Sequence, residues 1–417
     1  SRTVEIMGAR LYDKTPAIIR GHELDDEALP KINTIGDEEL TAVIGQLSSV
    51  FALSGYIGGV YKGGYFVETL EGKFSEAIRC KNSVAFNSAT SGLLAAAYAI
   101  DLGPGDEFIV SPFTMSATAA APAFLGATPV FVDIEPVTFC IDPEKVKSAI
   151  TAKTRAIFAT NLFGHPAQLA VLRKLADANN LFLIEDAAQS PFAMEGKKFA
   201  GTVGHIGVFS LNVHKHLQCG EGGICVTSDD TLADRMREFR NHGELFQDGR
   251  IGLNLRMTET SAAIAGAQLL KAEKIITGRI EQAQMLLNGF DEMPGIKTPV
   301  TRKGCVHVYY TVPFLYDKSI VGISRDTFLK VVHQEFFQHR KKTDVNPISH
   351  GYVKPLYHLP AFQGLPHHCP VAEDLHNHTL VYFENCTYSP SVRQLSQIAK
   401  VFEKIIDAAM RGDLKDD

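Results

Sequence analysis

Lys215 lies in a short segment that could hold a lysine as a reactive amine. The run from Phe209 to Gly223 reads FSLNVHKHLQCGEGG, so the lysine is flanked by histidines and falls between two apolar runs. A lysine near a strand end is usually a solvated cation. A lysine that is shielded from water becomes the neutral amine that condenses with a carbonyl group. The segment therefore indicates either a surface lysine or the attachment site of a carbonyl cofactor.

A candidate acid precedes this lysine in the chain. Leu181–Ser190 reads LFLIEDAAQS, which predicts a buried strand that ends in two carboxylates, Glu185 and Asp186. Asp186 would then lie at the carboxyl edge of the sheet, where open α/β sheets bind ligands. The alternative is a solvated or helix-capping aspartate, so this segment alone leaves its function open.

A third segment could bind an anion. Asn87–Gly92 reads NSATSG, a turn of small residues that leads from a strand into a helix. Free N–H groups and the helix dipole favour a phosphate at such a terminus, although an ordinary Ser or Thr N-cap would look the same. An amine, an acid for the ring nitrogen and phosphate donors are together what a pyridoxal-phosphate (PLP) site requires. The three segments thus predict a PLP enzyme.

An α/β fold would position these segments. From about residue 80 to 228, short β-branched or aromatic runs alternate with longer amphipathic runs, which is typical of β-α units around a mostly parallel sheet. We expect seven strands, flanked by helices, at 83–86, 107–110, 129–132, 155–159, 181–185, 206–210 and 223–227. The expected helices lie at 90–101, 115–125, 142–151 and 167–179.

The pattern changes near residue 290. A long helical pattern at 257–290 is followed by a region rich in Pro, His and aromatic residues and by a final helix at 391–411. A helix is also expected at 37–53, followed by a glycine- and tyrosine-rich loop at Ser54–Gly64. We therefore expect three parts, namely an N-terminal extension at 1–36, a large cofactor-binding domain at 37–290 and a small C-terminal α/β domain at 291–417.

Composition excludes several classes of protein. The 417 residues are 45% hydrophobic, carry a net charge of -6 and show no basic stripe, which argues against a nucleic-acid partner. The seven cysteines are scattered and form no C-x-x-C pair, which argues against a disulfide framework or a zinc ribbon. We expect no signal peptide and no membrane span, and hence a cytoplasmic protein.

From about residue 37 to the end, the chain resembles the DegT/DnrJ/EryC1/StrS group of sugar aminotransferases, which are fold-type I PLP enzymes. The order and spacing of many short motifs carry this resemblance. These motifs are Ser88–Thr90, Pro104–Glu107, Pro112–Thr114, Asp133–Ile134, Glu185–Ser190, Phe209–Ser210, Lys215, Glu221–Gly223 and Asn254–Glu259.

The resemblance implies a catalytic role for Lys215 and Asp186. Lys215 would carry PLP as a Schiff base (the internal aldimine) and would move the proton between cofactor and substrate carbons. Asp186 would pair with the pyridinium nitrogen, and Gln189 would approach the ring face or its 3-hydroxyl. The donor would be glutamate, or less often glutamine. The acceptor would be a keto-sugar, either nucleotide-linked or a free keto acid sugar.

The resemblance also implies how the phosphate is held. Ala89, Thr90 and Ser210 would bind it, beside Ser88 in the same turn. Asn254 would reach the phosphate from a neighbouring subunit. The active site would then be complete only in a homodimer with two shared sites.

Two departures from the family pattern affect this interpretation. The family usually places an aromatic residue over the cofactor ring where this chain has Met115, whose polarizable sulfur can still cover a ring. His214 and His216 flank the lysine, and a related branch that eliminates a sugar hydroxyl has histidine in place of the lysine itself. The retained Lys215 favours transamination over the alternatives, a PLP-dependent sugar dehydratase or a non-catalytic PLP- or sugar-binding homologue.

The C-terminal region offers weaker candidates. The segment Lys354–Phe362 resembles the part that closes over the substrate in this family, which makes Tyr357 and His358 candidate substrate contacts. Several histidines occur between His339 and His378, but only His376 and His378 are tightly spaced. Because no H-E-x-x-H pattern is present, we expect no metal site.

Overall fold

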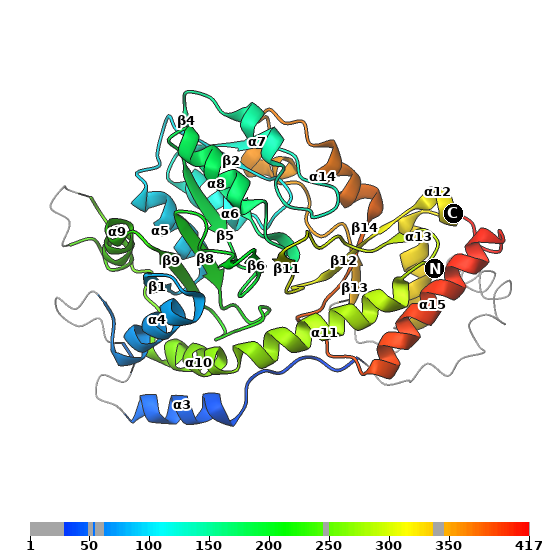
Figure 1. The fold of residues 1–417 in the computed structure, drawn as a ribbon, viewed down its shortest axis with the longest axis horizontal. Helices are drawn as coiled ribbons and strands as arrows, with labels where there is room; N and C mark the ends of the chain where they lie inside the picture. The colour runs from blue at the N-terminus through cyan, green and yellow to red at the C-terminus, as the bar shows by residue number, and fades with distance from the viewer. Residues whose placement is uncertain (1–28, 49–52, 55–61, 245–249, 337–345, 417) are drawn as a thin grey trace.

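The protein has a central seven-stranded sheet and, towards the C-terminus, a four-stranded sheet (Figure 1). The long helix α11 (Ala272–Phe290) runs from the first sheet towards the second (Figure 1). The computed structural model describes residues 29–48, 53–54, 62–244, 250–336 and 346–416. The central sheet is mostly parallel and flanked by helices, which confirms the predicted α/β fold.

The central sheet has the strand order β1-β9-β8-β5-β4-β2-β3. Strand β9 is antiparallel to both neighbours, and the other adjacent strands pair in parallel. All seven strands match the expected segments to within one residue at each end. Their bounds are β1 (Asn82–Phe86), β2 (Glu107–Val110), β3 (Thr128–Phe131), β4 (Thr154–Thr160), β5 (Phe182–Asp186), β8 (Ile206–Ser210) and β9 (Gly223–Thr227).

Both faces of this sheet are buried. Successive residues of a strand point to opposite faces, so Val208 packs towards α5, with Leu93 in the same core, whereas Phe209 packs with Phe74 on the other side. A strand that is covered on both faces needs apolar residues throughout. This is why continuous apolar runs predicted these strands well.

The helices of this part follow the strands in the expected order. One face of the sheet is covered by α5, α6 and α9, and the other by α4, α8 and α10. The expected helix at 257–290 forms two helices, α10 and α11, that meet at Lys271. The bounds are α3 (Asp37–Leu47), α4 (Tyr65–Ile78), α5 (Ala89–Ala99), α6 (Ala117–Phe124), α7 (Pro143–Ala149), α8 (Leu169–Ala178), α9 (Asp230–Arg240) and α10 (Glu259–Leu270).

The C-terminal sheet is antiparallel, with the order β10-β12-β14-β13. It has its own core, in which Phe290, Phe314, Phe328 and Phe402 pack ring against ring. The strands and helices of this C-terminal part are β10 (Ile296–Lys297), β12 (Val312–Tyr316), α12 (Lys318–Val321), α13 (Arg325–Phe336), β13 (Ile348–His350), α14 (Pro370–Asp374), β14 (Leu380–Phe383) and α15 (Val392–Met410).

A small third sheet connects distant parts of the chain. Strand β11 (Cys305–Val306) pairs with β6 (Met194–Glu195), which pairs with β7 (Lys198–Phe199). The domain division at residues 36 and 290 stays a prediction, and residues 1–28 of the expected N-terminal extension lie outside the described part. Within the described residues, no helix is both long and apolar enough to span a bilayer.

Candidate active site

The topology brings the three candidate segments to one edge of the central sheet. Strands β1, β5 and β8 all point the same way, so Asn87, Asp186 and Ser210 lie at or just beyond their carboxyl ends. Lys215 lies in the loop between β8 and the antiparallel β9, and Leu211 and Cys219 close this loop by a backbone hydrogen bond of 2.8 Å. Ligands of open α/β sheets bind at this edge.

Lys215 and Asp186 act on each other electrostatically. Burial lowers the pKa of Lys215, and the negative charge of Asp186 opposes this shift. Burial raises the pKa of Asp186, which is opposed by hydrogen bonds and by the charge of Lys215. A lysine whose pKa is lowered by burial and which feels the charge of an acid is suited to accepting and returning a proton. The structure therefore brings together the two residues that the sequence predicted as catalytic.

Asp186 is held by two hydrogen bonds. The Thr118 hydroxyl donates to Oδ2 over 2.6 Å, and the Ala188 N–H donates to Oδ1 over 3.1 Å. Thr118 itself lies in a buried row of hydroxyls with Thr114 and Thr160, at distances of 3.1 and 3.0 Å. These bonds lower the pKa of Asp186 against the effect of burial and orient its carboxylate.

The sequence analysis missed Thr118. A signal was present, because Thr114 and Thr118 are four residues apart and follow the end of β2. Threonines at this spacing can meet on one side of a helical turn. The sequence did not show that this turn faces Asp186.

The start of α5 provides a suitable place for a phosphate. Ser88 caps this helix by accepting a hydrogen bond from the Ser91 N–H over 3.1 Å, and the first N–H groups of a helix have no acceptor within it. Gly223 pairs with Ser210 and lies so close that a Cβ there would be 2.5 Å from the backbone nitrogen of Ala89. This close approach places Ser210 near the helix N-terminus, where an anion is favoured.

The predicted cofactor contacts Gln189 and Met115 occupy different environments. Gln189 is buried; its Oε1 accepts from the Phe163 N–H over 2.7 Å, and its Nε2 donates to the Tyr352 hydroxyl over 2.5 Å. Met115 is 60% exposed and directly follows Thr114. Both roles stay predictions.

Asn254 lies on the surface of the described chain, close to the same helix start. It forms an isolated bridge with Asn241, and the next residue, Leu255, accepts a hydrogen bond from the Asn87 N–H over 2.9 Å. The side chain is exposed, as a contact with a second subunit would require. The shared site stays a prediction.

The two predicted substrate contacts meet on one carboxylate. The Tyr357 hydroxyl donates to Glu373 over 2.8 Å, and His358 Nε2 lies 2.7 Å from the same oxygen. Tyr357 is only 2% exposed and stacks on His367 at a centroid distance of 3.7 Å. In the same region, the Tyr352 hydroxyl accepts a hydrogen bond from Gln189. A substrate role for Tyr357 and His358 stays a prediction.

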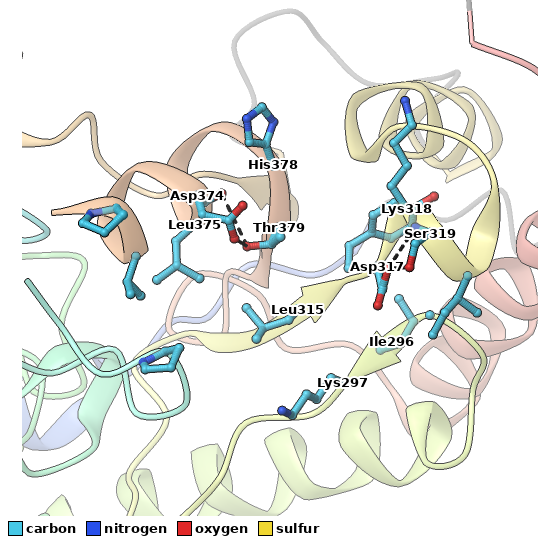
Figure 2. Close-up of a pocket in the computed structure, with 16 residues that line it drawn as sticks. Ile296, Lys297, Leu315, Asp317, Lys318, Ser319, Asp374, Leu375, His378 and Thr379 are labelled. Atoms are coloured by element: carbon cyan, nitrogen blue, oxygen red, sulfur yellow. Dashed lines mark hydrogen bonds between the residues drawn. The ribbon is translucent and has the colours of Figure 1, made fainter.

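A separate pocket lies by the C-terminal sheet (Figure 2). It has a volume of about 740 Å³ and is formed by β10, β12 and the segment from Pro370 to Thr379, with Leu315 and Leu375 on its walls. None of the predicted site residues lines it. We therefore place the active site at the edge of the central sheet and not in this pocket.

Comparisons with known proteins identify the family. A profile of the DegT/DnrJ/EryC1/StrS aminotransferase family matches residues 55–383. GDP-perosamine synthase of Escherichia coli O157:H7 is 31% identical over 318 residues, which cover 75% of this chain and 83% of that protein. The dTDP-3-amino-3,4,6-trideoxy-alpha-D-glucose transaminase of Streptomyces venezuelae is 32% identical over 309 residues, covering 73% and 78%.

Solved structures agree with this result. The structure of DesV from S. venezuelae superposes with a TM-score of 0.74 at 29% identity, covering 91% of this chain and 95% of that one. The comparisons confirm the family and the enzyme class that the motifs predicted. The chain therefore belongs to the DegT/DnrJ/EryC1/StrS aminotransferase family.

Proposed function

We propose that this enzyme transfers the amino group of glutamate to the ketone of a sugar, with PLP attached to Lys215. The meeting of Lys215, Asp186 and the α5 N-terminus at one sheet edge carries this proposal. The relatives named above, a GDP-perosamine synthase and a dTDP-amino-sugar transaminase, support a keto-sugar as acceptor. A nucleotide-linked sugar is therefore the acceptor that we propose first.

The residues at this edge fit PLP in chemistry and placement. Ser88–Thr90 and Ser210 would hold the phosphate, Asp186 would hold the ring nitrogen, and Gln189 would lie against the ring. When bound, PLP supplies a carbonyl that condenses with amines and a ring that withdraws electrons. The anionic form of Asp186, supported by the Thr118 hydroxyl, would keep the ring nitrogen protonated.

Lys215 would move the proton in both halves of the reaction. Its lowered pKa favours the neutral amine that can accept a proton, and the negative charge of Asp186 favours the protonated form that returns it. One residue with a shifted pKa can therefore serve as base and as acid. Glutamate and the ketone would use the same site in turn.

We further propose a homodimer in which Asn254 of each subunit reaches the other subunit's phosphate site. The exposed position of Asn254 supports this arrangement. This arrangement predicts that Asn254→Ala weakens PLP binding at the site of the other subunit, where Lys215 of that subunit holds the cofactor.

The absorption spectrum of the PLP-loaded protein tests the proposed reaction. Addition of glutamate without any ketone should replace the band of lysine-bound PLP by that of pyridoxamine phosphate. Lys215→Ala should not show the lysine-bound band and serves as the control. A wild-type band that glutamate leaves unchanged would contradict glutamate as the donor, and the absence of a band with added PLP would contradict the assignment of Lys215.

A further inference from the structure

An aromatic ring lies against the amine of Lys215. Nζ is 4.3 Å from the centroid of the Tyr310 ring. Tyr310 comes from the segment between β11 and β12, far from Lys215 in the sequence. A cation at this distance from a ring face is attracted by the π electrons. Tyr310 is therefore a direct partner of the lysine that we assign to the cofactor.

The neighbour of Lys215 holds the segment that carries Tyr310. His216 is 1% exposed, and its Nε2 lies 2.9 Å from the carbonyl oxygen of Val308. Because a carbonyl only accepts, Nε2 must carry the proton of the imidazole. Burial lowers the pKa of His216 to about 4, so the ring is neutral at pH 7 and adds no positive charge beside Lys215. The lysine loop and the tyrosine segment are thus joined by one hydrogen bond.

Two further hydrogen bonds fix the same segment. Asn385 Nδ2 donates to the carbonyl oxygen of Tyr309 over 2.7 Å, and the Tyr310 N–H donates to the carbonyl oxygen of Phe163 over 2.7 Å. Gly164 has a φ of +99°, and a Cβ there would lie 2.8 Å from the Tyr309 nitrogen. The backbone at Gly164 and the backbone at Tyr309 therefore lie closer together than a residue with a Cβ would allow. The position of the Tyr310 ring is set by segments from both sheets.

The charged groups around Lys215 explain why a ring is useful there. Burial lowers the pKa of Lys215, and the negative forms of Asp186, Cys386 and Glu384 oppose this. Burial raises the pKa of Cys386 to about 12 and that of Glu384 to about 7, so at neutral pH the thiol is neutral and Glu384 is only partly ionised. A neutral ring attracts the ammonium group whenever Lys215 is protonated, whether or not Glu384 is ionised.

The Tyr310 hydroxyl stays protonated over this range. Burial raises its pKa well above 10. The ring, and not a phenolate charge, is therefore what the amine meets.

We propose that Tyr310 is a positioning residue for Lys215, and that its ring face holds the protonated amine beside Asp186 whenever the lysine is not bound to the cofactor. The inference rests on the proposed role of Lys215 as the cofactor lysine. A lysine that is released and re-attached in each reaction cycle needs a defined resting position, because a free four-carbon side chain loses its placement. Tyr310 provides that position, and His216 and Asn385 maintain it.

The test measures the pKa of Lys215 in the full-length protein without cofactor. Trace labelling with acetic anhydride between pH 6 and 11, read by mass spectrometry, reports the deprotonated fraction of each lysine, and the exposed Lys73 is the internal reference. In Tyr310→Leu, the midpoint for Lys215 should fall by about one pH unit, because a shielded cation–π contact has about the free energy of one pKa unit. Tyr310→Phe, which keeps the ring, should behave like the wild type.

The outcomes separate this inference from the proposed function. An unchanged midpoint in folded Tyr310→Leu, or an equal fall in Tyr310→Phe, would overturn the role of the ring. If Tyr310→Leu does not fold, as judged by circular dichroism, Tyr310→Met provides a ring-free side chain of similar volume with the same expected fall. The labelling does not involve PLP, so failure to bind PLP would refute the proposed function without affecting this result.

Discussion

Replacement of Thr118 by valine should weaken PLP binding by about ten- to a hundredfold. The Thr118 hydroxyl donates a 2.6 Å hydrogen bond to Asp186, and valine has the same shape without the donor. A hydrogen bond to a charged acceptor contributes about 1.5–3 kcal/mol, and each 1.4 kcal/mol changes an equilibrium constant about tenfold. Burial already raises the pKa of Asp186, so loss of the donor raises it further. A protonated Asp186 cannot pair with a protonated ring nitrogen.

The assay is a titration of cofactor-free protein with PLP, followed by absorbance at several pH values. At neutral pH, the affinity of Thr118→Val for PLP should be lower than that of the wild type. As the pH is lowered, the affinity of the variant should also begin to decrease at a higher pH than that of the wild type. Thr118→Ser retains the hydroxyl and should bind normally. Thr114→Val is the matched control, because its hydroxyl contacts Thr118 and Thr160 but donates no hydrogen bond to Asp186. Wild-type affinity and pH dependence in folded Thr118→Val would refute the assigned role of Thr118.

Three further predictions concern the dimer, the pH dependence and the stability of the fold. Mixed Lys215→Ala and Asn254→Ala subunits should recover about a quarter of the wild-type activity, because half of the dimers are mixed and each has one intact site; no recovery would argue against a shared site. Burial raises the pKa of Glu384 from its usual value near 4.5 to about 7. In the cofactor-free protein, the contribution of the protonated Glu384 side chain to the free energy of unfolding is therefore fully present below pH 4.5 and is lost as the pH rises through about 7. In Glu384→Gln, the free energy of unfolding measured in urea should decrease less between pH 5 and pH 8 than in the wild type. An equal decrease in both proteins would contradict the raised pKa of Glu384. Glu71→Ala should lower the free energy of unfolding by about 3–5 kcal/mol, because it removes the carboxylate that lies 2.6 Å from the fully buried Arg240 guanidinium; a change below about 1 kcal/mol in urea unfolding would contradict this.

Continuous apolar runs made the central sheet predictable. In β4, all residues from Ala156 to Ala159 are fully buried, and each is alanine, isoleucine or phenylalanine. The helix break at Lys271 was not predictable in the same way. Lysine is a good helix former, and the apolar pattern continues across it, so only the packing of α10 against α3 and α4 and of α11 against α15 shows where the chain turns.

The histidines beside Lys215 illustrate the same limit. In the sequence, His214 and His216 look equivalent, but His214 is exposed and His216 is buried on the Val308 carbonyl. The C-terminal pair Tyr357 and His358 likewise could not be distinguished from Tyr352 as a site contact. Only the fold shows that Tyr352 meets Gln189, whereas Tyr357 and His358 meet Glu373.

The sequence by itself determined the candidate reacting groups of this protein and the strands that present them. Lys215 and Asp186 were predicted from the order and spacing of the family motifs; Asp186 ends an apolar run that must be a buried strand, and Lys215 lies in the loop that follows the next expected strand. The tertiary structure alone decided which neutral groups surround them. Thr118 is 68 residues from Asp186 in the chain, and Tyr310 comes from beyond α11, yet Thr118 contacts Asp186 and Tyr310 contacts Lys215. A threonine or tyrosine has no distinctive pattern in sequence, because its role arises only from the atom that folding places against it.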